Sequence, residues 1–252
     1  MVHFVGAGPG AADLITLRGK RLLEEADLII YAGSLVDPAL LDYKKAECRV
    51  MNSAEMTLEQ MGDAFKEAAE GGLTVVRLHS GDPSIYGAIR EQIDLLERLG
   101  IPYDVTPGVS SFLGAAAGLS AEFTVPEISQ SIIITRMAGR TPVPEKESMR
   151  RMASHGCSMA VFLSAGFLKE LEEELLAGGI YTKQTPAAIV YKATWPEEKV
   201  CRCSVGTLAE TAAREGIRKT AMILVGDFLE SSGKRSLLYD PAFTTEYRKG
   251  SQ

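Results

Sequence analysis

The chain has 252 residues, of which 46% are hydrophobic and 24% are charged. This composition can build a sizeable core and is typical of a folded globular protein. The net charge of −6 and the pI of about 5.3 weigh against a general nucleic-acid binder, which would be basic. No apolar run approaches the roughly 18 residues of a membrane helix. The N-terminus shows no signal-peptide pattern, so we expect a cytoplasmic protein.

The potential metal ligands are scattered. The four cysteines, at positions 48, 157, 201 and 203, form no C-x-x-C pair. The three histidines, at positions 3, 79 and 155, lack metal-ligand spacing. We therefore expect reduced thiols and no protein-bound metal.

In the first half of the chain, strand patterns alternate with helical patterns. We expect strands at residues 2–5, 28–31, 48–51, 73–78 and 103–106, and helices at 14–26, 57–70, 85–99 and 110–118. Asp13 is the expected cap of the first helix. This alternation predicts βαβ units and a mainly parallel sheet.

The pattern restarts in the second half. Strands are expected at 131–135, 159–163, 187–191, 200–205 and 221–225, and helices at 168–177 and 208–215. We predict two α/β domains with mainly parallel or mixed sheets, at residues 1–119 and 120–235, and a tail at 236–252. Small and charged residues predict disorder at 231–235 and 247–252.

A glycine-rich turn, Gly-Ala-Gly-Pro-Gly at residues 6–10, follows the first strand. With Ala11 it matches the dinucleotide fingerprint G-x-G-x-x-G/A. Two features oppose that interpretation. Pro9 removes a backbone N–H where a pyrophosphate needs donors, and the second strand ends without an acidic residue to hold a ribose. A tight strand-to-helix turn explains the glycines equally well.

Two further loops also follow strands. Residues 80–87 place Asp82 at a strand end, where parallel sheets hold their ligands, although Asp82 could simply cap a helix. Residues 106–112 offer serine hydroxyls at the start of a helix, where plain capping is again the alternative. No loop has a Walker lysine, and no Ser-His-Asp set is recognisable. We assign no catalytic residue.

Together these segments resemble the tetrapyrrole (corrin/porphyrin) methylase family. The resemblance rests on residues 5–10 with 13–16, on Gly81-Asp82-Pro83 with Tyr86-Gly87, on residues 107–111, and on residues 219–222. Residues 31–36 and 135–144 resemble the branch that methylates precorrin-4 at C-11. The resemblance implies a methyltransferase of cobalamin (vitamin B12) biosynthesis, acting on cobalt-precorrin-4 in the anaerobic form or on metal-free precorrin-4 in the aerobic form. We favour the anaerobic form, although no residue decides it.

The family fold consists of two α/β domains with S-adenosylmethionine in the cleft between them, usually in a homodimer. Position by position, the resemblance implies cofactor contacts from both domains. Those of the first domain are Pro9, Ser80, Gly81, Asp82, Ile85, Tyr86, Ser110 and Ser111. Those of the second domain are Leu163, Ala193, Thr220 and Ala221. Relatives often carry glycine at the position of Ala193.

The substrate carries many carboxylates, so its site should offer cations. Arg136 and Arg140, at the end of an expected strand, are the candidate substrate-binding residues because a guanidinium can pair with a carboxylate through two hydrogen bonds. A solvated basic loop is the alternative. Other functions also stay open: methylation of another tetrapyrrole position, methylation of RNA, an NAD-dependent oxidoreductase, or a ligand-binding protein without catalysis.

Overall fold

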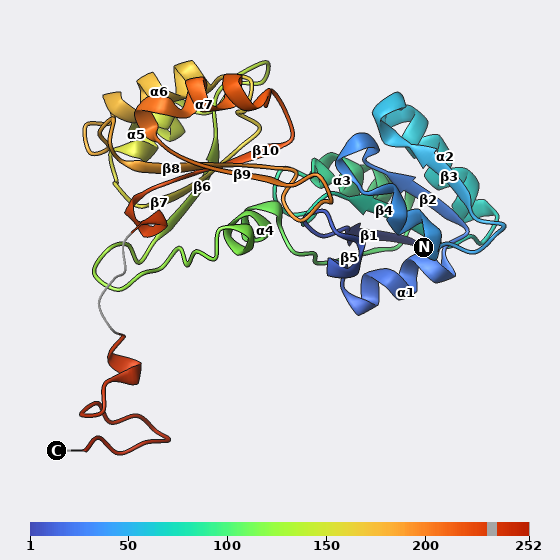
Figure 1. The fold of residues 1–252 in the computed structure, drawn as a ribbon. Helices are drawn as coiled ribbons and strands as arrows, with labels where there is room; N and C mark the ends of the chain where they lie inside the picture. Colours follow the sequence, from blue (N-terminus) through green and yellow to red (C-terminus); the bar gives the residue numbers. More distant parts are fainter. Residues whose placement is uncertain (231–235, 252) are drawn as a thin grey trace. The chain divides into compact units, whose positions relative to one another are not determined.

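The computed structural model describes residues 1–230 and 236–251. Contacts within the chain separate two compact units, each with a sheet of its own (Figure 1). The first unit comprises Met1–Ala115 together with Lys192–Glu198. The second comprises Ala116–Tyr191 and the residues from Lys199 onward.

The sheet of the first unit is fully parallel, as the sequence predicts. Its strands are β1 (Val2–Gly6), β2 (Leu28–Tyr31), β3 (Arg49–Asn52), β4 (Val75–His79) and β5 (Tyr103–Thr106). They are arranged in the order β3-β2-β4-β1-β5. Helices cover both faces of such a sheet, so its strands are apolar almost throughout.

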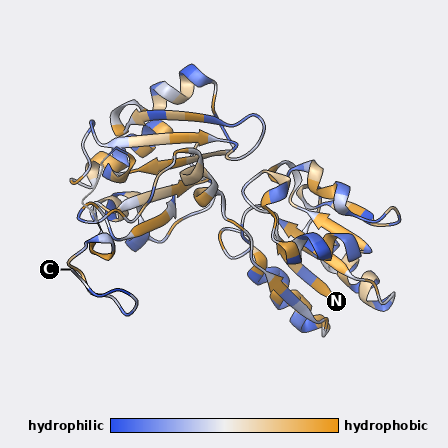
Figure 2. Ribbon diagram, turned by 60° about the horizontal axis from the view of Figure 1, so that its bottom comes forward, coloured by the Kyte–Doolittle hydropathy of each residue, from blue (hydrophilic) through white to orange (hydrophobic). Residues whose placement is uncertain are grey.

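Two apolar clusters lie on opposite faces of this sheet. Helices α2 (Leu58–Glu70) and α3 (Ile89–Leu99) cover one face, where Phe4, Ile30 and Phe65 are buried. Helix α1 (Leu17–Glu25) covers the other face, over Val5 and Ile29. Figure 2 shows the strands as the mainly apolar part of the unit, with polar residues along the helices.

Two helix starts differ from the sequence prediction. Thr16, not Asp13, caps α1, because its hydroxyl accepts the Gly19 N–H (3.1 Å), while Asp13 lies in a preceding 3-10 turn. Helix α3 begins four residues later than expected. Tyr86 and Ala88 have left-handed backbones, with φ of 55° and 49°, which an α-helix does not accommodate.

The sheet of the second unit is mixed. Its strands are β6 (Ile132–Arg136), β7 (Ser158–Phe162), β8 (Pro186–Tyr191), β9 (Lys199–Ser204) and β10 (Ala221–Val225), in the order β6-β7-β10-β8-β9. Within residues 1–230 and 236–251, only β6 and β7 of this sheet pair in parallel, because β10 runs against both of its neighbours and β8 and β9 form a hairpin. Strand–helix alternation alone does not reveal these reversals.

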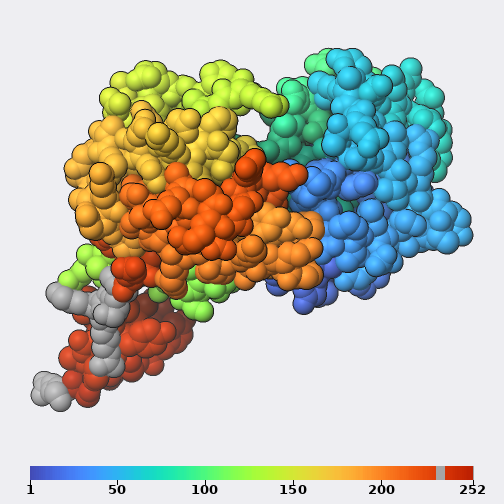
Figure 3. Space-filling view, turned by 45° about the horizontal axis from the view of Figure 1, so that its top comes forward, coloured from blue at the N-terminus to red at the C-terminus, as the bar shows by residue number. Residues whose placement is uncertain are grey.

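Three helices pack on one face of this sheet. Helices α6 (Leu168–Ala177) and α7 (Leu208–Glu215) begin and end where the sequence predicts. Figures 1 and 3 show them side by side, and they share an apolar cluster with Val161, Ile189 and Ile223. The short α5 (Met149–Ala153) was not expected, because five residues are too few to show a helical period. Helix α4 (Ser111–Gly118) spans the division between the units.

Arg248 joins several of the described C-terminal residues. The Arg248 guanidinium donates to the carbonyls of Leu238 (2.9 Å), Asp240 (2.6 Å) and Phe243 (3.4 Å). Residues 247–251 form neither helix nor strand. The disorder prediction for 231–235 and for residue 252 lies outside the described residues.

Candidate functional site

Three loops meet at one edge of the first sheet. Strands β4, β1 and β5 are adjacent and parallel, so the loops that follow them begin at the same edge. Gly8 and Gly81 exchange two backbone hydrogen bonds of 3.2 and 2.8 Å, which join the first two loops. The three motifs that the sequence singled out are therefore neighbours in space.

The glycines at this edge let the loops approach one another. A Cβ on Gly6 would lie 2.6 Å from the Gly108 Cα and 2.6 Å from the Gly81 carbonyl oxygen. A Cβ on Gly108 would lie 2.8 Å from the Gly6 Cα. From the sequence, the first-loop glycines fit either a dinucleotide fingerprint or a tight strand-to-helix turn. In the structure, the atoms nearest to a Cβ added at Gly6 or Gly108 are backbone atoms of the neighbouring loops, so at these two positions glycine allows the loops to approach one another.

Asp82 joins the second loop to the third. One carboxylate oxygen accepts the Ser84 N–H (2.8 Å) and hydroxyl (2.5 Å), and the other accepts the Gly108 N–H (2.8 Å). Partial burial alone would raise the pKa of Asp82, but these hydrogen bonds outweigh it and the pKa is lowered. The carboxylate stays charged at neutral pH and is engaged by its own loops.

The serines around Asp82 keep their polar groups available. The hydroxyls of Ser80, Ser110 and Ser111 have no hydrogen-bond partner among the described residues, although Ser110 is only 5% exposed. Tyr86 lies in the same loop, left-handed and 45% exposed. An exposed aromatic ring and unpaired hydroxyls at a strand edge suit a ligand with both apolar and polar parts.

The remaining cofactor candidates of the first loops are more enclosed. Pro9 is buried, and its side chain approaches Gly114 of α4, where a Cβ would lie 2.6 Å from the Pro9 Cβ. Ile85 is half-buried in the turn after Asp82, whose carbonyl accepts its N–H (3.3 Å). Gly81 has a φ of 61°, so the turn that carries Asp82 favours glycine there.

Most of the second-half candidates gather at one edge of the second sheet. Leu163 follows β7, and Thr220 and Ala221 stand where the antiparallel β10 begins. Leu163 and Thr220 both have a φ of 53°, and Leu163 is 64% exposed. Strained backbone and exposed apolar surface together are typical of ligand sites. Ala193 instead packs within the first unit, although it follows β8.

Arg136 and Arg140 do different things in the structure. Arg136 donates to the carbonyls of Met137 (3.1 Å), Thr141 (3.2 Å) and Pro142 (2.8 Å), so it shapes its own loop. Arg140 is exposed and has no hydrogen bond or ion pair with any residue that the structure describes. Of the two, Arg140 alone leaves its guanidinium without a partner among the described residues.

Sequence reasoning missed Ser164, which joins the loop after β6, where Arg136 and Arg140 lie, to the end of β7. Its side chain is completely buried, and its hydroxyl accepts the Met137 N–H (2.9 Å) and donates to the Phe162 carbonyl (2.7 Å). The loops after β6 and β7 are thereby joined. A lone serine in an unremarkable stretch offers no sequence signal for this role.

Comparison with known proteins identifies the family. The family model for Tetrapyrrole (Corrin/Porphyrin) Methylases matches residues 1–209. The chain belongs to the tetrapyrrole methylase family. The family predicted from the sequence motifs is thus confirmed.

Several relatives of this tetrapyrrole methylase cover almost its whole length. It is 51% identical to a cobalt-precorrin-4 C(11)-methyltransferase of Methanocaldococcus jannaschii, over 98% of this chain and 96% of the relative. It is 45% identical to the enzyme of the same name from Priestia megaterium, over 99% and 98%. A precorrin-4 C(11)-methyltransferase of a Sinorhizobium species is also 45% identical, over 98% of both chains.

Solved structures show the same fold. The X-ray structure of a cobalt precorrin-4 methyltransferase matches with a TM-score of 0.89 at 44% identity, covering 91% of this chain and 96% of that one. A uroporphyrin-III C-methyl transferase from Thermus thermophilus, complexed with S-adenosyl homocysteine, matches with a TM-score of 0.75 at 26% identity, over 93% and 95%. The prediction of a tetrapyrrole methylase fold with parallel and mixed sheets is confirmed.

Beneath the second loop, this methylase buries two basic groups that sequence reasoning did not assign. Arg77 donates to Gln92 (3.0 Å) and to two backbone carbonyls, and burial lowers its pKa to about 10. His79 is 3% exposed, and its Nε2 has no hydrogen-bond partner. Burial, and secondarily the charge of Arg77, lowers the pKa of His79 to about 3. The histidine is therefore neutral at physiological pH.

The structure offers little sign of metal or disulfide chemistry. All four cysteines are free thiols, and burial raises the pKa of Cys203 to about 11. Across residues 1–230 and 236–251, no group of three or more His, Cys, Asp or Glu side chains could hold a metal ion. In the same residues no helix is both long enough and apolar enough to span a bilayer.

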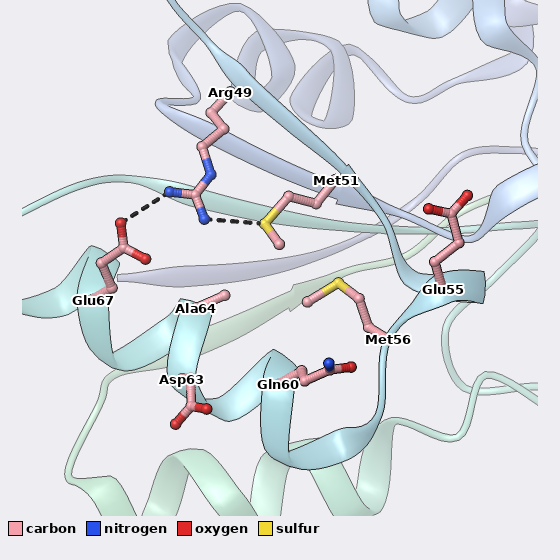
Figure 4. Close-up of a pocket in the computed structure, with 8 residues that line it drawn as sticks. All are labelled: Arg49, Met51, Glu55, Met56, Gln60, Asp63, Ala64 and Glu67. Atoms are coloured by element: carbon pink, nitrogen blue, oxygen red, sulfur yellow. Dashed lines mark hydrogen bonds and ion pairs between the residues drawn. The ribbon is translucent and has the colours of Figure 1, made fainter.

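A pocket of about 320 Å³ lies away from the three loops, between β3 and α2 (Figure 4). Met51, Met56 and Ala64 line it beside acidic side chains, and Arg49 pairs with Glu67 across one end (2.9 Å). None of the candidate cofactor or substrate residues lines this pocket. It lies at the edge strand of the sheet and has no part in the candidate site.

Proposed function

We propose that this tetrapyrrole methylase transfers a methyl group from S-adenosylmethionine to C-11 of cobalt-precorrin-4, a step of cobalamin biosynthesis. The observation that carries the proposal is the 51% identity, over nearly the full length, to a relative named for that reaction. The structural match at a TM-score of 0.89 supports it. An NAD-dependent oxidoreductase is disfavoured, because Pro9 lacks an N–H and β2 ends at Tyr31 without an acidic residue.

The residues of the first unit fit the cofactor. S-adenosylmethionine has an amino-acid part, a ribose and an adenine, which need polar partners and an apolar surface. The unpaired hydroxyls of Ser80, Ser110 and Ser111 supply polar partners, and the exposed Tyr86 ring supplies apolar surface. Asp82 acts through the loops that it joins. Leu163, Ala193, Thr220 and Ala221, with Pro9, Gly81 and Ile85, complete the proposed set of cofactor contacts.

The chemistry demands positioning more than acid–base catalysis. S-adenosylmethionine would supply a sulfonium-bound methyl group. The nucleophilic ring carbon would form its bond to that methyl in line with the breaking C–S bond, whose electron pair would leave with the sulfur of S-adenosylhomocysteine. The enamine-like carbon of a precorrin is already nucleophilic, so no strong general base is required. Holding the two partners in line can contribute roughly 7–11 kcal/mol at best. The joined loops of the first unit suit that task, because Asp82 and the Gly8–Gly81 bridge hold them together.

Arg140 is the proposed contact for a peripheral carboxylate of the substrate. Its guanidinium is exposed and uncommitted among the described residues, whereas that of Arg136 is occupied by three carbonyls of the loop. We retain Arg136 as part of the substrate site because it sets the shape of the loop that carries Arg140. Neither residue touches the reacting carbon in this proposal.

Metal-free precorrin-4 is the second candidate substrate, because a relative named for it is 45% identical, as similar as the Priestia megaterium enzyme named for the cobalt compound. The deciding experiment incubates the protein with labelled S-adenosylmethionine and either cobalt-precorrin-4 or precorrin-4. Label at C-11 of the cobalt compound supports the proposal, and label only in the metal-free compound reassigns the substrate. Calorimetry should show binding of S-adenosylhomocysteine but not of NADH; tight NADH binding alone would refute the proposal.

A homodimer in the cytoplasm is also part of the proposal. Leu237, Leu238 and Tyr239 are 64%, 63% and 70% exposed, and such apolar clusters are typical of interfaces. Four free thiols suit a reducing compartment. Light scattering at micromolar concentration should give about twice the 27.2 kDa chain mass. A monomer under active conditions contradicts the dimer.

A further inference from the structure

Several internal contacts hold the turn between β8 and β9. Lys192 and Thr194 are left-handed, with φ of 47° and 68°. Trp195 N–H donates to the Lys192 carbonyl (3.0 Å), and Thr194 N–H donates to the Glu198 carboxylate (2.6 Å). The Lys192 ammonium lies over the Trp195 ring, 4.9 Å from its centroid, and pairs with Glu197 (3.5 Å). These contacts fix both the backbone of the turn and the orientation of the indole.

This turn packs against the first glycine loop. Ala11 N–H donates to the Thr194 hydroxyl (2.9 Å) across 183 positions of sequence. Trp195 occupies the space beside Gly10, where an added Cβ would collide with the indole and with the Ala193 carbonyl oxygen. Pro9 and Thr194 both approach Gly114 of α4. The first glycine loop, the turn between β8 and β9, and helix α4 therefore pack together around Pro9 and Gly10.

The strain in the turn indicates that its shape matters. Thr194 is β-branched, and a left-handed backbone is unfavourable for such a residue. The conformation places its hydroxyl under Ala11 N–H, one residue beyond the Pro9-Gly10 turn. A loop that must receive a ligand binds more tightly when it is already held in the bound shape.

We propose that Thr194 and Trp195 are positioning residues that hold the Gly8–Gly10 loop in the shape that receives the cofactor. Thr194 acts by accepting the Ala11 N–H, and Trp195 acts by filling the side of Gly10. Neither residue is assigned a contact with the reacting atoms. The inference rests on the proposed function, because it concerns S-adenosylmethionine as the ligand of this loop.

The first test uses the native protein. Trp195 is the single tryptophan of the chain, so fluorescence excited at wavelengths that tyrosine does not absorb reports on the Gly10 side alone. Titration with S-adenosylhomocysteine should change the emission with the same midpoint as calorimetry. Calorimetric binding with unchanged emission would overturn the inference for Trp195. Absence of calorimetric binding would instead refute the proposed cofactor.

The second test replaces the hydroxyl. Thr194→Val removes the acceptor and keeps the branched shape, and it should weaken S-adenosylhomocysteine binding about tenfold. It should raise KM for S-adenosylmethionine similarly, with kcat at saturation within about twofold. Thr194→Ser keeps the acceptor and should restore most of the affinity. Thr124→Val, which removes an exposed hydroxyl bonded to Glu122 (3.3 Å), is the matched control and should bind normally.

A merely structural role predicts a different result. Thr194→Val would then lower the melting temperature and leave cofactor affinity unchanged, which would overturn the inference. If Thr194→Val does not fold, Glu198→Gln serves instead, because it weakens the anchor of the Thr194 N–H from outside the loop contact. Unchanged affinity in a folded Glu198→Gln protein, together with a normal affinity for Thr194→Ser, would count against the inference equally.

Discussion

The edges of the two sheets that carry the candidate residues are built differently. In the first unit three parallel neighbours end together, and their loops are joined through backbone at Gly6, Gly81 and Gly108. In the second unit the edge combines the ends of β6 and β7 with the start of β10, and side chains such as Ser164 and Arg136 hold the loops. A Cβ added at one of these glycines would collide with backbone atoms, whereas a side-chain contact can be removed by one substitution. The first edge should be intolerant of substitution and the second tunable.

The largest expected effect follows from this contrast. Gly108→Ala places a Cβ against the Gly81 carbonyl and the Gly6 Cα, which are backbone atoms that cannot move alone. It should destabilise the protein by about 3 kcal/mol. The matched change in the second unit is Gly166→Ala, where the nearest atom, the Arg218 carbonyl oxygen, would be 3.8 Å away. It should change stability by no more than about 0.5 kcal/mol. Urea denaturation of both variants measures the difference, and equal losses would break the comparison.

Asp82 gives the next effect. Asp82→Ala removes the acceptor of two hydrogen bonds within the second loop, from Ser84, and of the one from the Gly108 N–H that joins this loop to the third. Cofactor affinity should fall by roughly 1–3 kcal/mol, because the loops lose their mutual alignment. Ser84→Ala, which removes only one of these hydrogen bonds, should cost less. Calorimetry with S-adenosylhomocysteine measures both, and a folded Asp82→Ala protein with unchanged affinity would reduce Asp82 to a local cap.

The two units should also respond differently to acid. The first buries Arg77 and His79, whereas the polar residues buried in the second unit, among those described, are Thr135, Ser158, Ser164, Thr185 and Thr211. The folded pKa of His79, about 3, lies below its ordinary 6.5. As pH falls, the unfolded chain therefore takes up the proton before the folded chain does. The contribution of neutral His79 to stability is fully present above pH 6.5 and is lost as pH falls toward 3. The loss is about 1.4 kcal/mol for each pH unit in that window.

A variant isolates this contribution from that of the carboxylates. His79→Phe should flatten the fall in stability between pH 6.5 and 5 relative to the parent protein. His155→Gln, at an exposed histidine, is the matched control for replacing a histidine side chain. Denaturation midpoints measured across the pH range give the difference. Parallel curves for His79→Phe and the parent would show that His79 is not buried as a neutral group.

The same contrast explains what the sequence could predict. Parallel sheets collect their ligand loops at strand ends, so the sequence singled out as candidates the three loops that follow strands, at residues 6–10, 80–87 and 106–112. Helices α6 and α7 were predicted to the residue because their apolar periods are uninterrupted. The start of α3 was missed because nothing in residues 85–88 reveals the left-handed backbones of Tyr86 and Ala88.

Long-range contacts account for most of the remainder. The antiparallel course of β10 depends on pairing with both β7 and β8, which no local pattern records. Thr194 reaches Ala11 across 183 residues, and Ser164 joins two loops through one hydroxyl. Such roles depend on packing between distant segments, and single polar residues carry no periodic signal for them.

The smallest expected effect concerns the tunable edge. Arg140→Ala should raise KM for cobalt-precorrin-4 about fivefold, or ~1 kcal/mol, because an exposed guanidinium holds a carboxylate against competing water. Melting temperature and S-adenosylhomocysteine affinity should not change, since Arg140 has no partner within the described chain. Arg140→Lys should recover only part of the loss, because the ammonium keeps the charge but not the planar fork.

Arg136 serves as the contrasting variant for this prediction. Arg136→Ala frees the carbonyls of Met137, Thr141 and Pro142, so it should lower the melting temperature and raise KM together. The decisive result is whether the melting temperature falls together with the rise in KM, as expected for Arg136→Ala, or stays unchanged, as expected for Arg140→Ala. This difference separates a residue that binds substrate from one that shapes the loop. Unaltered kinetics in both Ala variants would show that residues 136–142 form only a solvated basic surface. Arg136 and Arg140 would then be excluded from the substrate site, and the second sheet edge would contribute only cofactor contacts.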